Sequence, residues 1–265
     1  MRPLARRALL AVSVAVVAAA PRPAGAAAPE SYAVGSFPVA PGGVAVEFPV
    51  GRGLQGEVGA VVLGQGAYEE SNPFTYLSVV SPSAWLHYDG RRNLRLSLGF
   101  QELFQREVPA MGLQDGHEER IVGRARIQQP RGAAAIYELL QLDVRSFEDA
   151  GGTHRVVFRP RLRIGQGFNL DASRIHSVVL FQEVAFRFSG SDYAERAFEF
   201  FRAFVGYTWT TRRGTFVTAG VIGQIVLNPP ATAYNVMYGP LLSVNYRFRA
   251  APPAAPPEPT NVDLP

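Results

Sequence analysis

The stretch HRVVFRPRLRI, residues 154–164, decides the class of fold. Its two kinds of side chain fall on opposite faces of an extended chain: Val156, Phe158, Pro160, Leu162 and Ile164 on one face, and Arg155, Arg159, Arg161 and Arg163 on the other. A β-strand turns successive side chains to opposite sides, so this spacing predicts a strand with one apolar face and one guanidinium-rich face.

The same alternation recurs along the chain. Arg120, Arg124 and Arg126 oppose Ile121, Ala125 and Ile127, and the last such segment places an apolar residue at every second position from Val236 to Phe248. Clusters of turn-forming residues such as Asp89-Gly90 separate the segments. The pattern predicts about ten strands, with eight or twelve as alternatives, over residues 56–68, 75–88, 93–105, 117–129, 134–146, 154–166, 176–189, 198–211, 215–227 and 235–249.

Two stretches, Ala133 to Val144 and Tyr193 to Phe204, also fit helical spacing, and their strand neighbours favour the strand interpretation. Pro82 lies inside the second predicted strand. Proline cannot donate a ladder hydrogen bond, so we expect a bulge or a break there.

Composition excludes several classes of protein. The chain has 265 residues and no cysteine, which excludes a disulfide scaffold, thiolate catalysis and a zinc-thiolate site. Arg2, Arg6, Arg7 and Arg22 supply the excess of positive charge. Without residues 1–26 the chain is formally neutral, so we expect no nucleic-acid partner.

The first 26 residues are expected to be a secretory signal peptide. Three arginines precede an uninterrupted apolar run at 8–20, and Ala24-Gly25-Ala26 offers small residues for cleavage. We expect an irregular lead-in at 27–55, a barrel at 56–249 and a Pro-rich disordered tail at 250–265.

Alternation alone fits two kinds of barrel: a soluble one with its apolar face inside, and a membrane one with its apolar face outside. The segments are longer than ordinary strands, their polar faces carry Arg, Gly, Ser, Thr and Gln, and aromatic pairs such as Tyr207 with Trp209 lie at their ends. These features favour an all-β, antiparallel, up-and-down transmembrane β-barrel in the outer membrane of a Gram-negative cell. A soluble periplasmic β-protein is the alternative.

The lengths of the predicted connections alternate between short and long. Bacterial barrels have short periplasmic turns and longer outer loops, so an even number of strands would place both ends of the barrel on the periplasmic side.

The region from about Phe74 to Arg249 resembles a family of uncharacterised outer-membrane β-barrels of Gram-negative bacteria, known only as a domain of unknown function. The resemblance rests on the Trp85 hairpin around Asp89-Gly90-Arg91, on the two Arg-rich strands and on Tyr246-Arg247-Phe248. It implies an outer-membrane barrel. The closing strand also resembles the signal that the barrel-assembly machinery reads, although a tail follows Phe248.

The candidate functional site is the arginine-rich face. Its predicted lumen residues are Arg120, Arg124, Arg126, Arg155, Arg159, Arg161, Arg163 and Glu183, with Asp143 as a further acid. One interpretation is a structural network in which carboxylates and water satisfy the guanidinium groups. Another is a small pore or cavity that binds or passes small anionic solutes.

No cofactor, metal site or catalytic residue is predicted. The four histidines lack the spacing of metal pairs. A lipid-modifying barrel enzyme is the remaining alternative, with Ser83 and His87, or Ser177 and His154, as conceivable pairs that no nucleophile motif frames. The expected partners are outer-membrane lipid and the assembly machinery, and the chain is expected to be a monomer.

Overall fold

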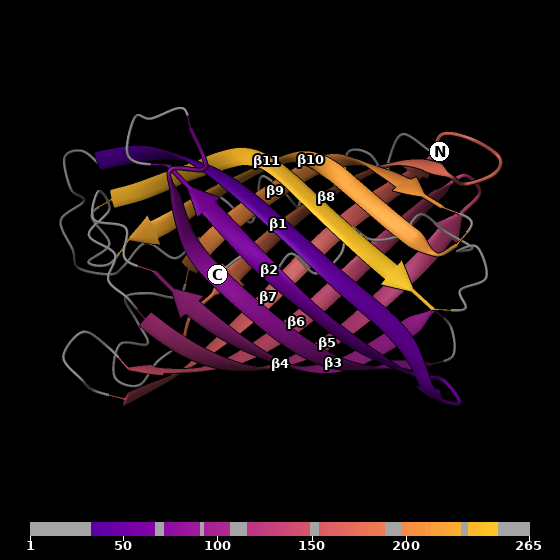
Figure 1. Ribbon diagram of the computed structural model, residues 1–265, viewed down its shortest axis with the longest axis horizontal. Helices are drawn as coiled ribbons and strands as arrows, with labels where there is room; N and C mark the ends of the chain where they lie inside the picture. The colour runs from indigo at the N-terminus through magenta and orange to yellow at the C-terminus, as the bar shows by residue number, and fades with distance from the viewer. Residues whose placement is uncertain are drawn as a thin grey trace.

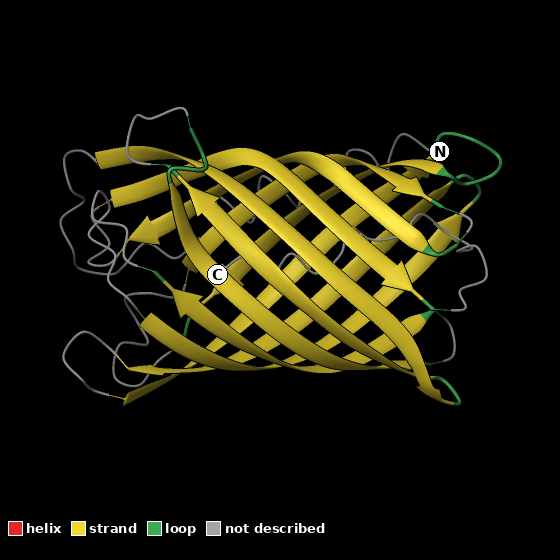
Figure 2. Cartoon of the chain, viewed as in Figure 1, coloured by secondary structure: helices red, strands yellow, loops and turns green. Residues whose placement is uncertain are grey.

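The computed structural model describes residues 33–66, 72–90, 93–106, 116–148, 154–188, 198–211, 213–228 and 233–248. These residues form a barrel of strands (Figures 1 and 2). Its strands are β1 (Ala33–Gly51), β2 (Leu54–Gln65), β3 (Tyr76–Asp89), β4 (Leu94–Gln105), β5 (Gly116–Arg131), β6 (Ala134–Glu148), β7 (His154–Asn169), β8 (His176–Phe186), β9 (Phe198–Thr210), β10 (Thr215–Asn228) and β11 (Ala233–Arg247).

Each strand pairs with its neighbours in the sequence, and all of these consecutive pairs are antiparallel. The barrel closes where β1 meets β11, and this pair is parallel. In Figure 1 the indigo β1 and the yellow β11 run side by side in the same direction across the front wall. The prediction of an all-β barrel is therefore confirmed. The expectation of a purely antiparallel one is wrong at this seam.

The expected irregular lead-in at 27–55 contains the strand that the prediction missed. β1 has 19 residues, and the barrel has eleven strands in the described chain instead of ten. Pro38, Pro41 and Pro49 conceal it, because prolines are scarce inside sheets. The structure tolerates Pro41 because the ladder to β11 is interrupted between the pairs Pro38↔Tyr238 and Gly42↔Leu242.

Backbones approach closely at this interruption. A Cβ atom on Gly239 of β11 would lie 1.7 Å from the carbonyl oxygen of Val39. Glycine at 239 therefore permits the contact that seats β1 against β11.

The odd number of strands also changes the expected placement of the ends. β1 and β11 are parallel, so both strands start on the same side of the barrel. The first residue of β1 and the last residue of β11 therefore lie on opposite sides. The expectation that both ends of the barrel share one side is wrong. The end that holds the turns at 52–53 and 132–133 is called the short-turn end below, and the other is called the long-loop end.

Of the two stretches that also fit helical spacing, the first lies in β6 from Ala134 on and the described part of the second, from Phe198 on, lies in β9, so both are strands as predicted; residues 193–197 lie outside the described residues. Pro82 lies within a continuous β3, where it pairs with Ala60 of β2. The ladder from β3 to β4 has no pairs at Ser81 and Pro82, and its register is the same before and after them. The expected break therefore occurs on one side of the strand, without a bulge.

The two faces of the wall differ as an inverted barrel requires. Large apolar side chains are exposed on the outside, among them Leu98, Ile121, Leu140, Val205 and Leu242. Charged and polar side chains are buried inside, together with an apolar cluster that includes Val39, Tyr137, Phe181 and Phe204. Water-soluble barrels place these two classes the other way round.

Exposed aromatic side chains lie on the outer wall near both ends of the strands. Near the short-turn end these are Phe48, Tyr88, Phe168, Tyr207, Trp209 and Phe248. Near the long-loop end these are Phe104, Phe158 and Tyr238. Aromatic girdles of this kind lie at the two interfaces of a membrane barrel. Within the residues that the structure describes, no helix has the length and apolar character needed to cross a membrane.

Candidate functional site

The centre of the lumen is an ion network between β6, β7, β8 and β9. Glu183 of β8 accepts from two arginines of the facing strand β7: its Oε1 lies 2.6 Å from Arg161 Nη2 and its Oε2 lies 2.6 Å from Arg163 Nη2. Arg161, Arg163 and Glu183 are each 2% exposed. Arg163 and Glu183 are directly opposite in the ladder between β7 and β8. Arg161 precedes Arg163 by two residues, so its side chain lies on the same face of the sheet.

Asp143 of β6 is the second carboxylate of the centre. It lies directly opposite Arg159, whose Nε donates to Asp143 Oδ2 at 2.7 Å. Gln141 links the network to β5: it accepts from Arg124 Nε at 2.7 Å and donates to Asp143 Oδ1 at 2.5 Å. Because an unpaired ion in a dry interior costs several kcal/mol, these contacts decide whether the guanidinium groups can stay inside.

A second pair of carboxylates extends the network toward the long-loop end. Glu118 Oε2 accepts from Arg145 Nη2 at 2.6 Å, and Glu118 also binds Arg120. Glu199 of β9 lies 3.1 Å from Arg145 Nη1 and 2.8 Å from Arg187 Nη2. Arg145 therefore joins two carboxylates that come from different strands.

Arginines outnumber acids in this part of the lumen. Glu118, Asp143, Glu183 and Glu199 face a larger set of guanidinium groups on the same strands, which are Arg120, Arg124, Arg145, Arg159, Arg161, Arg163 and Arg202. Some of the surplus guanidinium groups lie over the faces of aromatic rings. Arg202 lies 4.6 Å from the centroid of the Phe200 ring, and Arg124 lies 3.8 Å from that of Trp85. The interior remains positive overall.

A separate ion cluster lies at the short-turn end. Arg95 Nε lies 2.6 Å from Asp89 Oδ1, and Arg95 Nη2 lies 3.2 Å from Glu47 Oε1. Glu47 also lies 2.8 Å from Arg247 Nη2. Glu47 belongs to β1 and Arg247 to β11, so this cluster ties the seam to β4.

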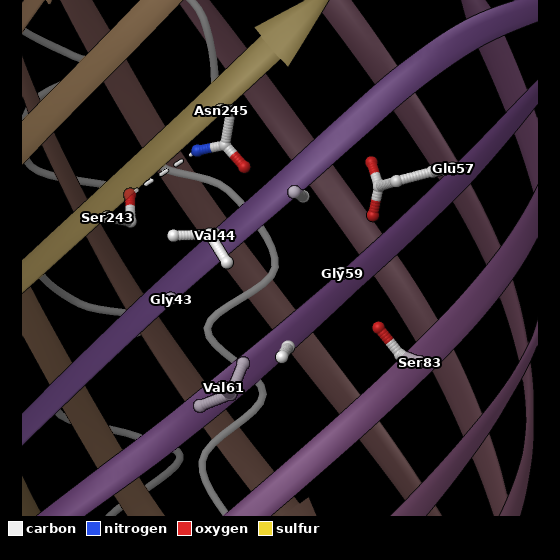
Figure 3. Close-up of a pocket in the computed structure, with 10 residues that line it drawn as sticks. Gly43, Val44, Glu57, Gly59, Val61, Ser83, Ser243 and Asn245 are labelled. Atoms are coloured by element: carbon white, nitrogen blue, oxygen red, sulfur yellow. Dashed lines mark hydrogen bonds between the residues drawn. The ribbon is translucent and has the colours of Figure 1, made fainter.

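The opposite wall of the lumen is built from small residues. Gly43, Ala45, Gly59, Ser83 and Ser243 line a small pocket that is partly open to solvent. Figure 3 shows that the residues around it come from neighbouring strands of one wall, with Glu57 and Asn245 at its polar side. The lumen is thus filled by long side chains on one side, and the other side holds a small pocket next to the apolar cluster, to which Val61 belongs.

Most of the predicted lumen residues face inward. Arg120, Arg124, Arg159, Arg161, Arg163 and Glu183 are buried and belong to the network, as does Arg202. Arg126 is half-buried, and its charge acts on Asp89 of the short-turn cluster. Arg155 has the inward parity of Arg159 but is exposed near the long-loop end. Arg249, which shares the polar face of the last predicted strand, lies outside the described residues.

Several acids of the lumen escaped the sequence analysis. Glu118 lies an even number of residues from Arg120 and Arg124, so it shares their face of the strand. The alternation could therefore have assigned it to the lumen. Glu47 lies on β1, the strand that the prediction missed, and Glu57 lies at the very start of the first predicted strand. Glu199 gives no sequence signal: a register irregularity between β8 and β9 buries it together with the adjacent Phe200.

The serine–histidine pairs considered from the sequence do not form. His87 Nδ1 lies 2.8 Å from Ser97 Oγ, and His87 Nε2 lies 3.5 Å from Glu57 Oε2. Ser177 donates to Asn169 instead of facing His154, and His154 Nε2 lies 2.8 Å from Ser146 Oγ. Ser97, His87 and Glu57 form an inward-facing hydroxyl–imidazole–carboxylate group that the sequence did not indicate.

One group of possible metal ligands lies on the outer wall. Glu102, His117 and Glu119 bring one ligand atom each within 4.8 Å of one another. Glu102 and Glu119 are directly opposite across β4 and β5. All three side chains are at least partly exposed, so solvent can satisfy them without an ion.

No model of a known protein family matches the sequence. No curated protein matches it either. Among solved structures, the chain is similar to an anion-selective porin from Comamonas acidovorans, with 16% sequence identity and a TM-score of 0.35 over 74% of this chain. The match covers 53% of that porin, so the chain spans about half of its length.

Proposed function

We propose that the protein is an outer-membrane β-barrel of structural or small-pore type, with a lumen that favours small anions. The observation that carries the proposal is the inverted wall, with exposed apolar side chains outside and buried guanidinium groups inside. In water this outer wall would leave a large apolar surface exposed, which is unfavourable. Contact with lipid tails removes that free-energy cost. Outer-membrane lipid is then its main partner.

The filled half of the lumen supports a narrow passage instead of a wide channel. Arg159, Arg161 and Arg202 have almost no solvent contact, so they block that half. Any path for solute runs beside them, along the wall of small residues. The excess of guanidinium groups over carboxylates then favours anions over cations along this path.

A fractionation experiment tests the location. We expect the protein to sediment with outer membranes, to need detergent for extraction, and to migrate differently in gels with and without heating. A folded protein that stays dissolved in plain buffer would contradict the proposal and favour a soluble periplasmic β-protein. Dependence on the assembly machinery and a monomeric state are part of the same proposal and are measured by depletion and by light scattering in detergent.

Single-channel recording tests the selectivity. Refolded protein in a planar bilayer is expected to pass small anions in preference to cations. Arg161→Glu is expected to weaken that preference at least several-fold, because it replaces a positive charge beside the path with a negative one. Glu138→Gln changes a carboxylate on the outer wall and serves as the control. A silent bilayer would leave the structural role and remove the pore.

The absence of cysteine makes the topology directly testable. Arg52→Cys labels the turn between β1 and β2, and Asn72→Cys labels the connection between β2 and β3 at the other end. If the short turns are periplasmic, an impermeant maleimide applied to intact cells modifies Asn72→Cys alone. Modification of Arg52→Cys alone would reverse the orientation, and equal modification of both would contradict the spanning barrel.

A further inference from the structure

We propose that Ser97, His87 and Glu57 form a hydrolytic site in the lumen, for carboxylic esters that carry an anionic group. This proposal does not rest on ion conduction. It rests on the geometry of three side chains from β2, β3 and β4, which no sequence motif groups together.

The register of the barrel places the three groups in line. Ser97 is directly opposite His87, and Glu57 is opposite Trp85, two residues before His87 on the same face. His87 Nδ1 lies 2.8 Å from Ser97 Oγ, and His87 Nε2 lies 3.5 Å from Glu57 Oε2. Hydroxyl, imidazole and carboxylate therefore follow one another in the order that an activated serine requires.

The charge of the Glu57 carboxylate favours the useful tautomer of the imidazole. Among the described residues His87 Nε2 has no hydrogen-bond partner, but Glu57 Oε2 lies 3.5 Å from it, so the carboxylate favours a proton on Nε2 and leaves the lone pair of Nδ1 facing the Ser97 hydroxyl. His87 is 3% exposed and Glu57 is 5% exposed, and the Trp85 ring stacks parallel to the imidazole at 6.3 Å. Burial and the hydrogen bond with Ser97 thus hold the base in place. Glu57 is a positioning residue, whereas Ser97 and His87 would touch the reacting atoms.

Ser97 is also reachable. It is half-exposed and lies near the start of β4, close to the short-turn end. The pocket of small residues reaches Glu57, the carboxylate of the group (Figure 3). In contrast, the arginines of the central network are almost completely enclosed.

Three guanidinium groups define the class of substrate. Arg124 is directly opposite Ser97 on β5, Arg95 precedes Ser97 by two residues on the same face, and Arg126 is opposite Arg95. Their positive charge favours an ester with a carboxylate or phosphate in one of its halves. It also favours the negative charge that develops on the carbonyl oxygen during attack.

The reaction needs water as its only co-reactant. Ser97 Oγ bonds to the ester carbonyl carbon while its proton passes to His87 Nδ1. The bond from that carbon to the alcohol oxygen then breaks, and the alcohol leaves with the proton from His87. Water attacks the acyl group on Ser97, His87 takes a proton from it, and the carboxylic acid is released with the serine hydroxyl restored.

The test uses the full mature chain refolded in detergent, with folding checked by its heat-dependent mobility. A fluorophosphonate probe is expected to label the folded wild type, to be lost in Ser97→Ala, and to fall about 100-fold or more in His87→Gln. Ser146→Ala removes another serine that is hydrogen-bonded to a histidine and is expected to leave labelling unchanged. Absence of labelling in the folded wild type, or persistence in Ser97→Ala, overturns the proposal.

Ester hydrolysis separates the roles of the neighbours. Glu57→Gln is expected to lower kcat about tenfold with little change in KM, and Glu57→Asp to restore part of it, because the carboxylate only orients the base. Arg126→Gln is expected to raise KM for 4-nitrophenyl hydrogen glutarate and not for the neutral 4-nitrophenyl butyrate. An equal effect on both esters would contradict the assigned substrate class. Ser97→Ala is expected to keep its conductance, so failure here and failure of the pore are distinguishable.

Discussion

The two halves of the lumen follow the same alternation and have opposite interiors. From β5 to β9 the inward positions carry arginines that meet carboxylates and aromatic rings across the barrel. On β11, β1, β2 and β3 the inward positions near the pocket carry Gly, Ala and Ser. The first half fills the barrel, and the second half leaves a small pocket. The side-chain volume on one wall therefore decides where a solute or a substrate can go.

The largest expected effect lies in the filled half. Glu183→Gln removes the charge that Arg161 and Arg163 share, and so takes a carboxylate away from two buried guanidinium groups. We expect a loss of about 3–5 kcal/mol in the free energy of unfolding, measured by urea titration in detergent or lipid vesicles. Glu138→Gln, on the outer wall, is expected to change it by less than about 0.5 kcal/mol. Equal losses in the two variants would show that the network does not stabilise the barrel.

The next largest expected effect lies at the β1–β11 pair, in the half of the barrel that holds the pocket. Gly239→Ala places a Cβ atom against the carbonyl oxygen of Val39, so β1 and β11 must separate locally. The expected loss is about 1–3 kcal/mol in the free energy of unfolding. Gly223→Ala is the matched control on β10, because a Cβ atom added there would meet no heavy atom within 4 Å. A stable Gly239→Ala variant would indicate that β1 is not seated as described.

The smallest expected effect is on conductance, when a side chain fills the pocket of small residues. Ser83→Phe directs an aromatic ring into the pocket and is expected to lower the single-channel conductance a few-fold without unfolding the barrel. Ala84→Phe adds the same ring to the neighbouring outward position, where lipid accommodates it, and is expected to leave the conductance unchanged. If both variants conduct as the wild type does, the path does not run along the small-residue wall.

Much of the fold was predictable because a period of two is a local property. Each strand from β2 to β11 was predicted, and Arg159, Arg161 and Arg163 were assigned to the inner face on parity alone. β1 escaped because its inward positions include Pro41, Gly43 and Ala45, which give little apolar alternation, and because its prolines are typical of loops. Its place in the barrel depends on an interrupted ladder with β11 and on Gly239, which are features of pairing across the whole chain.

The site follows the same division. Parity predicted which arginines face inward, and it would also have assigned Glu118. It could not predict Arg155, which has the parity of its neighbours but lies beyond the enclosed part of β7. Nor could it predict Glu199, whose burial depends on an irregular register between β8 and β9.

The sequence alone determined that the chain forms alternating strands, and that its arginines share one face, because side-chain direction in a strand depends only on position. Tertiary structure decided how many strands close the barrel, which carboxylate meets which guanidinium group, and that Ser97 faces His87. Those outcomes depend on ladder register and closure, since contacts between residues far apart in the chain are set only when all the strands have paired.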